Sequence, residues 1–291
     1  MKYLLILAIS FFNLVASDAF ITPGELKKSL HDTNLIIIDV ADYKIYKASH
    51  IKGARHADIS KFVNPESLYS LMHSPQIIQK ELSNLGINSD SKVVIYSHNT
   101  ENGILNSSYM AFILLYSGFE NLAILDGGYL AWVFENELLT SSITPDSKND
   151  GNFIVKLNKE ILVTSDYIQD NLAAVTMLDA RSPQMYYGIK RSNNVRLTGH
   201  ISYAKSSYYM DKFLRDGTLR EQKELDEIFI FGHELKENDE VIIYADTVFR
   251  ASMEFYILYK HMGFKNSKLY EASLLEWGNS IDLPMTRFKW E

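Results

Sequence analysis

The stretch VIIYADTVFRASMEF, residues 241–255, decides the fold of this chain. Its first four residues, VIIY, form a β-branched and aromatic run that is typical of a strand inside a sheet. The sequence from Ala251 onward has helical spacing and reaches Gly263, a residue type that often follows a helix C-terminus. A strand that leads through a short loop into a helix is the unit of α/β proteins, and such loops bind anions or carry nucleophiles. The first candidate site is therefore the loop Ala245, Asp246, Thr247, Val248, Phe249 and Arg250.

The chain contains this unit twice. VVIYSHNT at residues 93–100 resembles VIIYADTV at 241–248, and SGFENLAILDGGYLAW at 117–132 resembles MGFKNSKLYEASLLEW at 262–277. Residues 35–58 and 177–204 also match, since each segment has a strand-like run ending in Asp and a later His-Ile pair. A repeat this long indicates a duplicated domain, because solenoid units are far shorter. We predict a first domain over residues 22–141, a polar linker over 142–150 and a second domain over 151–291.

Each half alternates strand-like runs with helical patterns, which indicates a parallel sheet covered by helices on both faces. The expected strands are residues 35–40, 93–97 and 123–125 in the first half and 176–178, 241–244 and 268–270 in the second. Sites in such sheets lie beyond the carboxyl ends of the strands. This places the candidate sites at residues 97–103 and 245–250.

Residues 1–19 are predicted to be a signal peptide. Lys2 precedes the apolar run YLLILAISFFNLVA, and small residues then favour cleavage before Asp18 or before Phe20. The alternative is a membrane anchor, but the run is shorter than the roughly 20 residues a spanning helix needs, and Asn13 interrupts it. We therefore expect an exported protein, periplasmic or secreted, without stable membrane insertion after cleavage.

Composition excludes several classes of function. The formal net charge of −7 argues against a nucleic-acid-binding protein, which usually has a basic face. The chain has no cysteine, so it forms no disulfide and no thiol-based mechanism is open to it. The histidines show no HExxH or HxxxH spacing, and we predict neither a metal site nor a cofactor.

Together, these landmarks resemble the rhodanese family of sulfurtransferases in its tandem form. The family's entry motif, a strand ending in Asp followed by a GHI-type turn, is similar to residues 35–58 and 178–204, and DGG…W at 126–132 resembles its closing turn. The resemblance covers residues 22–278. It implies two tandem rhodanese-like domains, each with a central, mainly parallel sheet flanked by helices.

The resemblance also implies where activity is lost. In tandem members the second domain usually carries the catalytic Cys, and that position is Ala245 here, with Ser97 as its counterpart in the first half. Val248 and Phe249 tolerate positive φ poorly, although the family's loop curls tightly around an anionic sulfur. Asp246 adds a negative charge, and Met185 occupies the position of the family's donor-binding Arg.

Three other features have alternative interpretations. Ser97 with His98 resembles a nucleophile beside a base, but neighbours on an extended chain point to opposite sides, which favours a solvated loop. Arg250 at a helix start is either a contact for a small anion or a salt-bridge partner of Asp246 or Glu254. The resemblance implies structural roles for the following residues: Asp39, Asp179, Arg181, His50 and His200.

Two hypotheses of different class follow. The first is an exported, catalytically degenerate protein that retains at most the binding of a small anion or a protein partner. The alternative is a thiosulfate or 3-mercaptopyruvate sulfurtransferase whose Cys at position 245 was lost recently or replaced by engineering. A test of Ala245→Cys for sulfur transfer discriminates between them.

Overall fold

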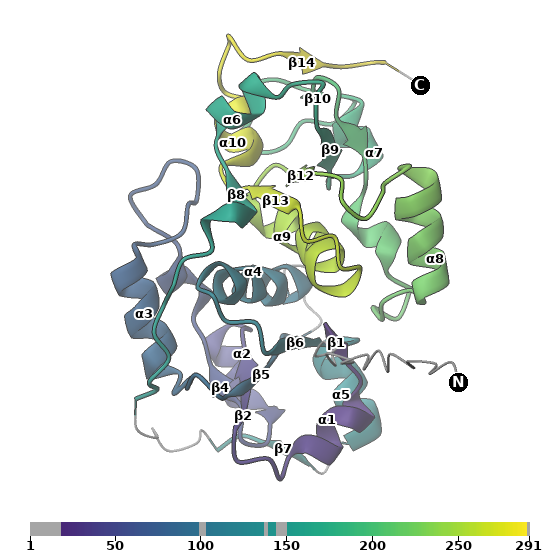
Figure 1. The fold of residues 1–291 in the computed structure, drawn as a ribbon. Helices are drawn as coiled ribbons and strands as arrows, with labels where there is room; N and C mark the ends of the chain where they lie inside the picture. Colours follow the sequence, from purple (N-terminus) through teal and green to yellow (C-terminus); the bar gives the residue numbers. More distant parts are fainter. Residues whose placement is uncertain (1–18, 99–102, 137–138, 144–149, 290–291) are drawn as a thin grey trace, which may run out of the picture.

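The computed structural model describes residues 19–98, 103–136, 139–143 and 150–289. The predicted signal segment, apart from Ala19, lies outside the described residues, as do residues 144–149 of the predicted linker. The chain forms two α/β domains, with the first half in purple to teal and the second in green to yellow (Figure 1). None of the helices in these ranges is long and apolar enough to cross a bilayer.

The first domain is built on a five-stranded parallel sheet with the order β1-β6-β5-β2-β4. Its strands are β1 (Phe20–Ile21), β2 (Leu35–Asp39), β4 (Arg55–His56), β5 (Lys92–Tyr96) and β6 (Leu122–Leu125). Its helices are α1 (Pro23–Ser29), α2 (Tyr43–Ala48), α3 (Pro75–Asn84), α4 (Gly103–Tyr116) and α5 (Gly128–Asn136). A short antiparallel pair, β3 (His50–Ile51) with β7 (Thr140–Ser141), completes the domain.

The second domain repeats this arrangement element by element. Its parallel sheet has the order β8-β13-β12-β9-β11, made of β8 (Leu162–Val163), β9 (Thr176–Asp179), β11 (Lys205–Ser206), β12 (Val241–Tyr244) and β13 (Ser267–Tyr270). Its helices are α6 (Ser165–Asp170), α7 (Pro183–Tyr186), α8 (Gln222–Asp226), α9 (Val248–Tyr256) and α10 (Ser273–Trp277), and β10 (His200–Ile201) pairs with β14 (Met285–Thr286). The predicted fold class is confirmed.

The register shows that the two candidate strands are equivalent. Asp39 lies opposite Tyr96 in the first sheet, and Asp179 lies opposite Tyr244 in the second. All four residues of β12 are buried, which is the pattern of a central parallel strand covered on both faces. Both Tyr hydroxyls accept a hydrogen bond from the backbone N–H of the Ile in the His-Ile pair, at 2.9 and 3.0 Å.

The helix after β12 begins earlier than predicted. The sequence favoured a start at Ala251, but α9 starts at Val248, directly after the extended Thr247. Its last turns widen into a π-helix (Ile257–His261), and Gly263 follows with a φ of +80°. Only three residues therefore separate the end of β12 from the start of α9, which leaves little chain to form a loop.

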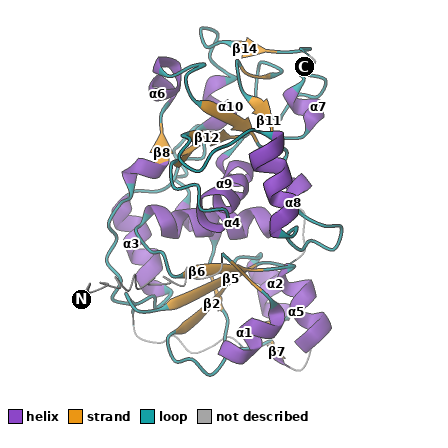
Figure 2. Cartoon of the chain, turned by 45° about the vertical axis from the view of Figure 1, so that its right-hand side comes forward, coloured by secondary structure: helices purple, strands orange, loops and turns teal. Residues whose placement is uncertain are grey.

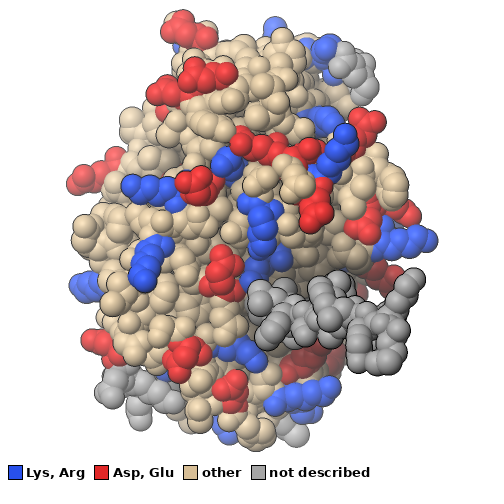
Figure 3. Space-filling view, viewed as in Figure 1, with Lys and Arg blue, Asp and Glu red and all other residues tan. Residues whose placement is uncertain are grey.

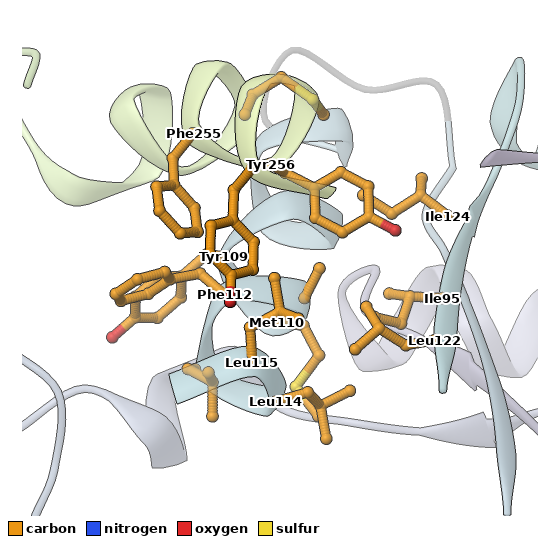
Figure 4. Close-up of a cluster of buried hydrophobic side chains, with 14 of the residues drawn as sticks. Ile95, Tyr109, Met110, Phe112, Leu114, Leu115, Leu122, Ile124, Phe255 and Tyr256 are labelled. Atoms are coloured by element: carbon orange, nitrogen blue, oxygen red, sulfur yellow. The ribbon is translucent and has the colours of Figure 1, made fainter. Parts of the chain in front are cut away.

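The two domains share one hydrophobic core. Helices α4 and α9 lie side by side between the two sheets in both views (Figures 1 and 2). The rings of Phe112 and Phe255 meet edge to face at 5.4 Å, and those of Tyr109 and Phe249 lie 4.6 Å apart. Figure 4 shows Tyr256 and Phe255 packed over Tyr109, Met110 and their neighbours on α4. Because α4 is buried between its own sheet and α9, it is apolar on nearly every side.

Candidate functional site

The loop between β12 and α9 is closed around Ala245. The Ala245 methyl group is fully buried in the hydrophobic core, and so is the Val248 side chain. The backbone N–H of Ala245 donates to the Ser273 hydroxyl at 3.3 Å, and its carbonyl accepts from the Leu274 N–H at 3.1 Å. Ala245, the position equivalent to Ser97, is therefore enclosed by packed atoms of the described chain.

The loop does not curl into an anion-binding ring. None of the described residues with positive φ falls within 245–250, and the chain passes directly into α9. The Asp246 carboxylate accepts the Thr247 N–H at 3.1 Å. This carboxylate thus takes up an amide that an anion would need at a helix start.

Arg250 is paired with Asp246. Its Nη1 donates to both carboxylate oxygens, at 2.7 and 2.6 Å. Burial lowers the pKa of Arg250, but the charge of Asp246 and its hydrogen bonds outweigh this effect, so the pKa is raised. Glu254, the other candidate partner, pairs instead with Lys212 at 3.0 Å in the interior of the second domain. Of the two interpretations of Arg250, the structure has the salt bridge with Asp246.

A shallow pocket remains beside this ion pair. It has a volume of about 190 Å³ and is lined by Thr247, Phe249 and Arg250 with Leu105 and Asn106 of α4. The Arg250 side chain is about one third exposed there. Met185 is not among the lining residues; it lies half-buried on α7, where its Sδ accepts from the Ser192 hydroxyl at 3.5 Å.

Asp179 and Arg181 form a buried ion pair at the end of β9. Arg181 donates from Nε to Asp179 Oδ1 at 2.9 Å and from Nη2 to Oδ2 at 2.5 Å, and Nη2 also reaches the Gly199 carbonyl at 2.6 Å. The pair thereby joins the strand end to the His-Ile segment. The first domain has no equivalent Arg, because Ala41 occupies the matching position after Asp39.

His98 takes the place of that arginine in the first domain. Its Nε2 lies 3.3 Å from Asp39 Oδ2, and its ring stacks on Tyr129 at 3.9 Å. Ser97 does not lie in the solvated loop that the sequence favoured: it is 5% exposed, and its hydroxyl has no hydrogen-bond partner among the described residues. Since His98 makes no hydrogen bond to that hydroxyl, the pair lacks the geometry of a nucleophile and its base.

His50 and His200 have matching positions in the two domains. Each ring bonds through Nδ1 to a backbone carbonyl at 2.8 Å, that of Tyr46 or Tyr186, and stacks on the same tyrosine. Burial lowers the pKa of His200, opposed by the hydrogen bond to Tyr186. These contacts hold the chain at the turn. Within the described ranges, no group of three or more His, Asp or Glu side chains is arranged to hold a metal ion.

Sequence reasoning missed one titratable group at the domain boundary. Glu271, directly after β13, is 7% exposed and accepts a hydrogen bond from the backbone N–H of Met72 in the other domain. Burial raises the pKa of Glu271 to about 7. The contact joins residues that are distant in the chain, so no local sequence pattern predicts it.

Comparison with known proteins agrees with this architecture. The family model described as a rhodanese-like domain matches residues 22–135 and again residues 164–280. The sulfur carrier protein TtuD of Thermus thermophilus is 25% identical over 285 residues, covering 93% of this chain and 97% of that protein. A thiosulfate sulfurtransferase of Corynebacterium glutamicum is 25% identical over 256 residues, covering 84% and 82%. The crystal structure of YnjE superposes with a TM-score of 0.83 at 21% identity, covering 94% of this chain and 69% of that one.

Proposed function

Because this chain belongs to the rhodanese family, with two tandem rhodanese-like domains, we propose that it is an exported member that has lost sulfur transfer. The observation that carries the proposal is the absence of cysteine from the whole sequence, with Ala245 at the position that the resemblance assigns to the catalytic thiol. Sulfur transfer in this family passes through a persulfide on that thiol, and a methyl group forms none.

The surroundings of Ala245 support a long-standing loss. A simple exchange of Cys for Ala would leave an open, curled loop, whereas here Val248 is buried and Asp246 occupies the Thr247 amide. The names of the relatives, a sulfur carrier protein and a thiosulfate sulfurtransferase, favour the alternative, a thiosulfate or 3-mercaptopyruvate sulfurtransferase whose Cys at position 245 was lost recently or replaced by engineering. The packed loop argues against that alternative, because filling an open active-site loop with side chains requires several substitutions and not only the loss of the Cys.

The role retained by the former active site is at most the binding of a small anion or a protein partner. An anion at Arg250 has to share the guanidinium with Asp246, which already receives two charge-assisted bonds. One further charge-assisted hydrogen bond contributes about 1.5–3 kcal/mol before the loss of hydration and entropy of the anion is subtracted, so the anion binds weakly. The face seen in Figure 3 intersperses Lys and Arg with Asp and Glu, which supports a role without nucleic acid.

Export rests on the sequence of the first 19 residues, with a periplasmic or secreted location. The fold adds a detail to it: Ala19 is buried, and its carbonyl accepts from the Ile124 N–H at 2.9 Å and from the Tyr256 hydroxyl at 2.5 Å. Cleavage before Asp18 keeps these bonds, whereas cleavage before Phe20 removes them. We therefore favour the first of the two candidate sites.

Two measurements on the purified chain test this proposal. With thiosulfate and cyanide as substrates, the protein should form no thiocyanate above the rate without protein. Sulfate should bind weakly in a calorimetric titration, and Arg250→Ala should abolish the signal. Thiocyanate formation by the unmodified chain that depends on protein concentration would refute the proposed loss of activity.

A further inference from the structure

The first domain retains an open cavity at the edge where the second domain is closed. The cavity has a volume of about 190 Å³ and lies at the carboxyl ends of the central strands of the first sheet. Ser97 directly follows β5, Asp126 directly follows β6, and both line it together with Phe20 of β1. Met210 and Phe213 of the second domain form part of its wall. Ligands of α/β sheets bind at this edge, so its place in the fold is that of a binding site.

An unused hydrogen-bonding group lies in this cavity. Ser97 is 5% exposed, and its Oγ makes no hydrogen bond within the described chain. A buried hydroxyl without a partner is unfavourable, and a ligand atom bonded to it recovers that free energy. The other serine in the lining, Ser107, already donates to the Gly103 carbonyl at 3.3 Å. Ser97 is therefore the hydroxyl available to a ligand.

The charge of the cavity is negative. Its lining contains the Asp126 carboxylate, whose Oδ1 accepts from the Leu219 N–H at 2.8 Å. Burial raises the pKa of Asp126, because its hydrogen bonds do not fully compensate the ionised carboxylate for the water that it loses. In the part of the chain that the structure describes, no Lys or Arg lines the cavity. His98, also in the lining, lies against the buried carboxylate of Asp39. A cation is favoured here, and an anion is repelled.

The rest of the lining is apolar. Phe20, Ile104, Ile124 and Phe213 contribute hydrocarbon and aromatic surface. An apolar cavity of about 150 Å³ in a protein interior is large enough for one benzene ring, so this cavity accommodates a ring with a short substituent. Size, apolar walls and charge together define a small molecule with one ring and one cationic group.

We propose that this cavity is a binding site for a small amine, whose ammonium group is held by Asp126 and Ser97 and whose apolar body packs against Phe20 and Phe213. The site goes beyond the degenerate role proposed above, since it does not use the loop at 245–250. It also differs from that loop in ligand charge: Arg250 offers a contact for anions, whereas this cavity excludes them.

The test compares three probes of one shape on the full chain by isothermal titration calorimetry. The probes are benzylamine, which is positively charged, benzyl alcohol, which is neutral, and benzoate, which is negatively charged. We expect benzylamine to bind at least tenfold more tightly than benzoate, with benzyl alcohol between them. Equal or tighter binding of benzoate that persists in Arg250→Ala, or no measurable binding of benzylamine, overturns the proposal.

Variants then locate the site. Asp126→Asn keeps an oxygen that accepts the Leu219 N–H. This variant should weaken the binding of benzylamine at least tenfold and change the affinity for benzyl alcohol less than about twofold. Ser97→Ala should weaken the binding of benzylamine and of benzyl alcohol by roughly two- to tenfold, which is the effect of losing one hydrogen bond. Ile104→Trp fills the cavity and should abolish binding, whereas the matched control Arg250→Ala should leave it unchanged. Unchanged affinities in Asp126→Asn and Ile104→Trp, with either variant folded, would refute the site.

Discussion

Glu271 should make the stability of this protein depend on pH near neutrality. Its carboxyl group is buried where the end of β13 meets the first domain, and the backbone N–H of Met72 donates to it. Burial raises its pKa to about 7 from the ordinary value of 4.5, with the Met72 hydrogen bond opposing the shift. The folded protein therefore holds this proton more tightly than the unfolded chain does.

The sign and size of the effect follow from this difference. A carboxyl group whose folded pKa is raised contributes stability that is fully present below pH 4.5 and is lost as pH rises through 7. The shift of about 2.5 pKa units corresponds to about 3 kcal/mol of unfolding free energy, at about 1.4 kcal/mol per unit. Glu271→Gln removes the titration and keeps an oxygen that accepts the Met72 N–H.

The assay is urea unfolding of both proteins at a series of pH values from 4.5 to 8.5. The unfolding free energy of Glu271→Gln minus that of the wild type should increase by about 3 kcal/mol, with the rise between pH 4.5 and about 7 and a plateau above that. Glu237→Gln, at an exposed glutamate, is the matched control and should follow the wild type. Parallel curves for wild type and Glu271→Gln would refute the assigned protonation of Glu271.

Three further predictions concern the ion pair, the shared core and the N-terminus. Arg181→Ala leaves the buried Asp179 carboxylate unpaired and should lower the unfolding free energy by about 3–5 kcal/mol in urea unfolding; a loss below 1 kcal/mol would contradict a buried pair. Phe255→Ala opens the core between α4 and α9 and should cost about 3–5 kcal/mol, with both domains unfolding in one transition; two separated transitions in the wild type would contradict a shared core. Mass spectrometry of protein from the native envelope should find a mature chain that begins at Asp18, because the Ala19 carbonyl is hydrogen-bonded in the fold; an intact N-terminus would contradict cleavage.

The sequence predicted the fold because the evidence for it is local and repeated. The runs VVIY and VIIY are apolar on both faces, and each is followed by a helical pattern, so two equivalent central strands were expected. The start of α9 was misplaced because Asp246 to Arg250 carry no strong helix signal. Packing against α4 fixes that start, which is a tertiary effect.

The candidate site was predictable only in part. A count of residue types is enough to show that the thiol is missing, and the sequence named Asp246 as one of two candidate salt-bridge partners of Arg250. The contact between His98 and Asp39 depends on the pairing of β2 with β5, and on Ala41 standing where the second domain has an Arg. No spacing in the sequence predicts this contact. The Glu271–Met72 contact likewise depends on how the two domains pack.

The rate of thiocyanate formation by Ala245→Cys tests the central claim most directly. The claim is that the second domain has lost the whole site and not only its sulfur atom. With thiosulfate and cyanide, the variant should show no rate above that of the wild type, although its thiol reacts once the protein is unfolded. Ala245 is fully buried, and the Asp246 carboxylate already accepts the Thr247 N–H beside it, so a thiolate there is neither formed nor reached. A rate many times that of the wild type would contradict this account and identify the chain as a sulfurtransferase that lacks only its cysteine.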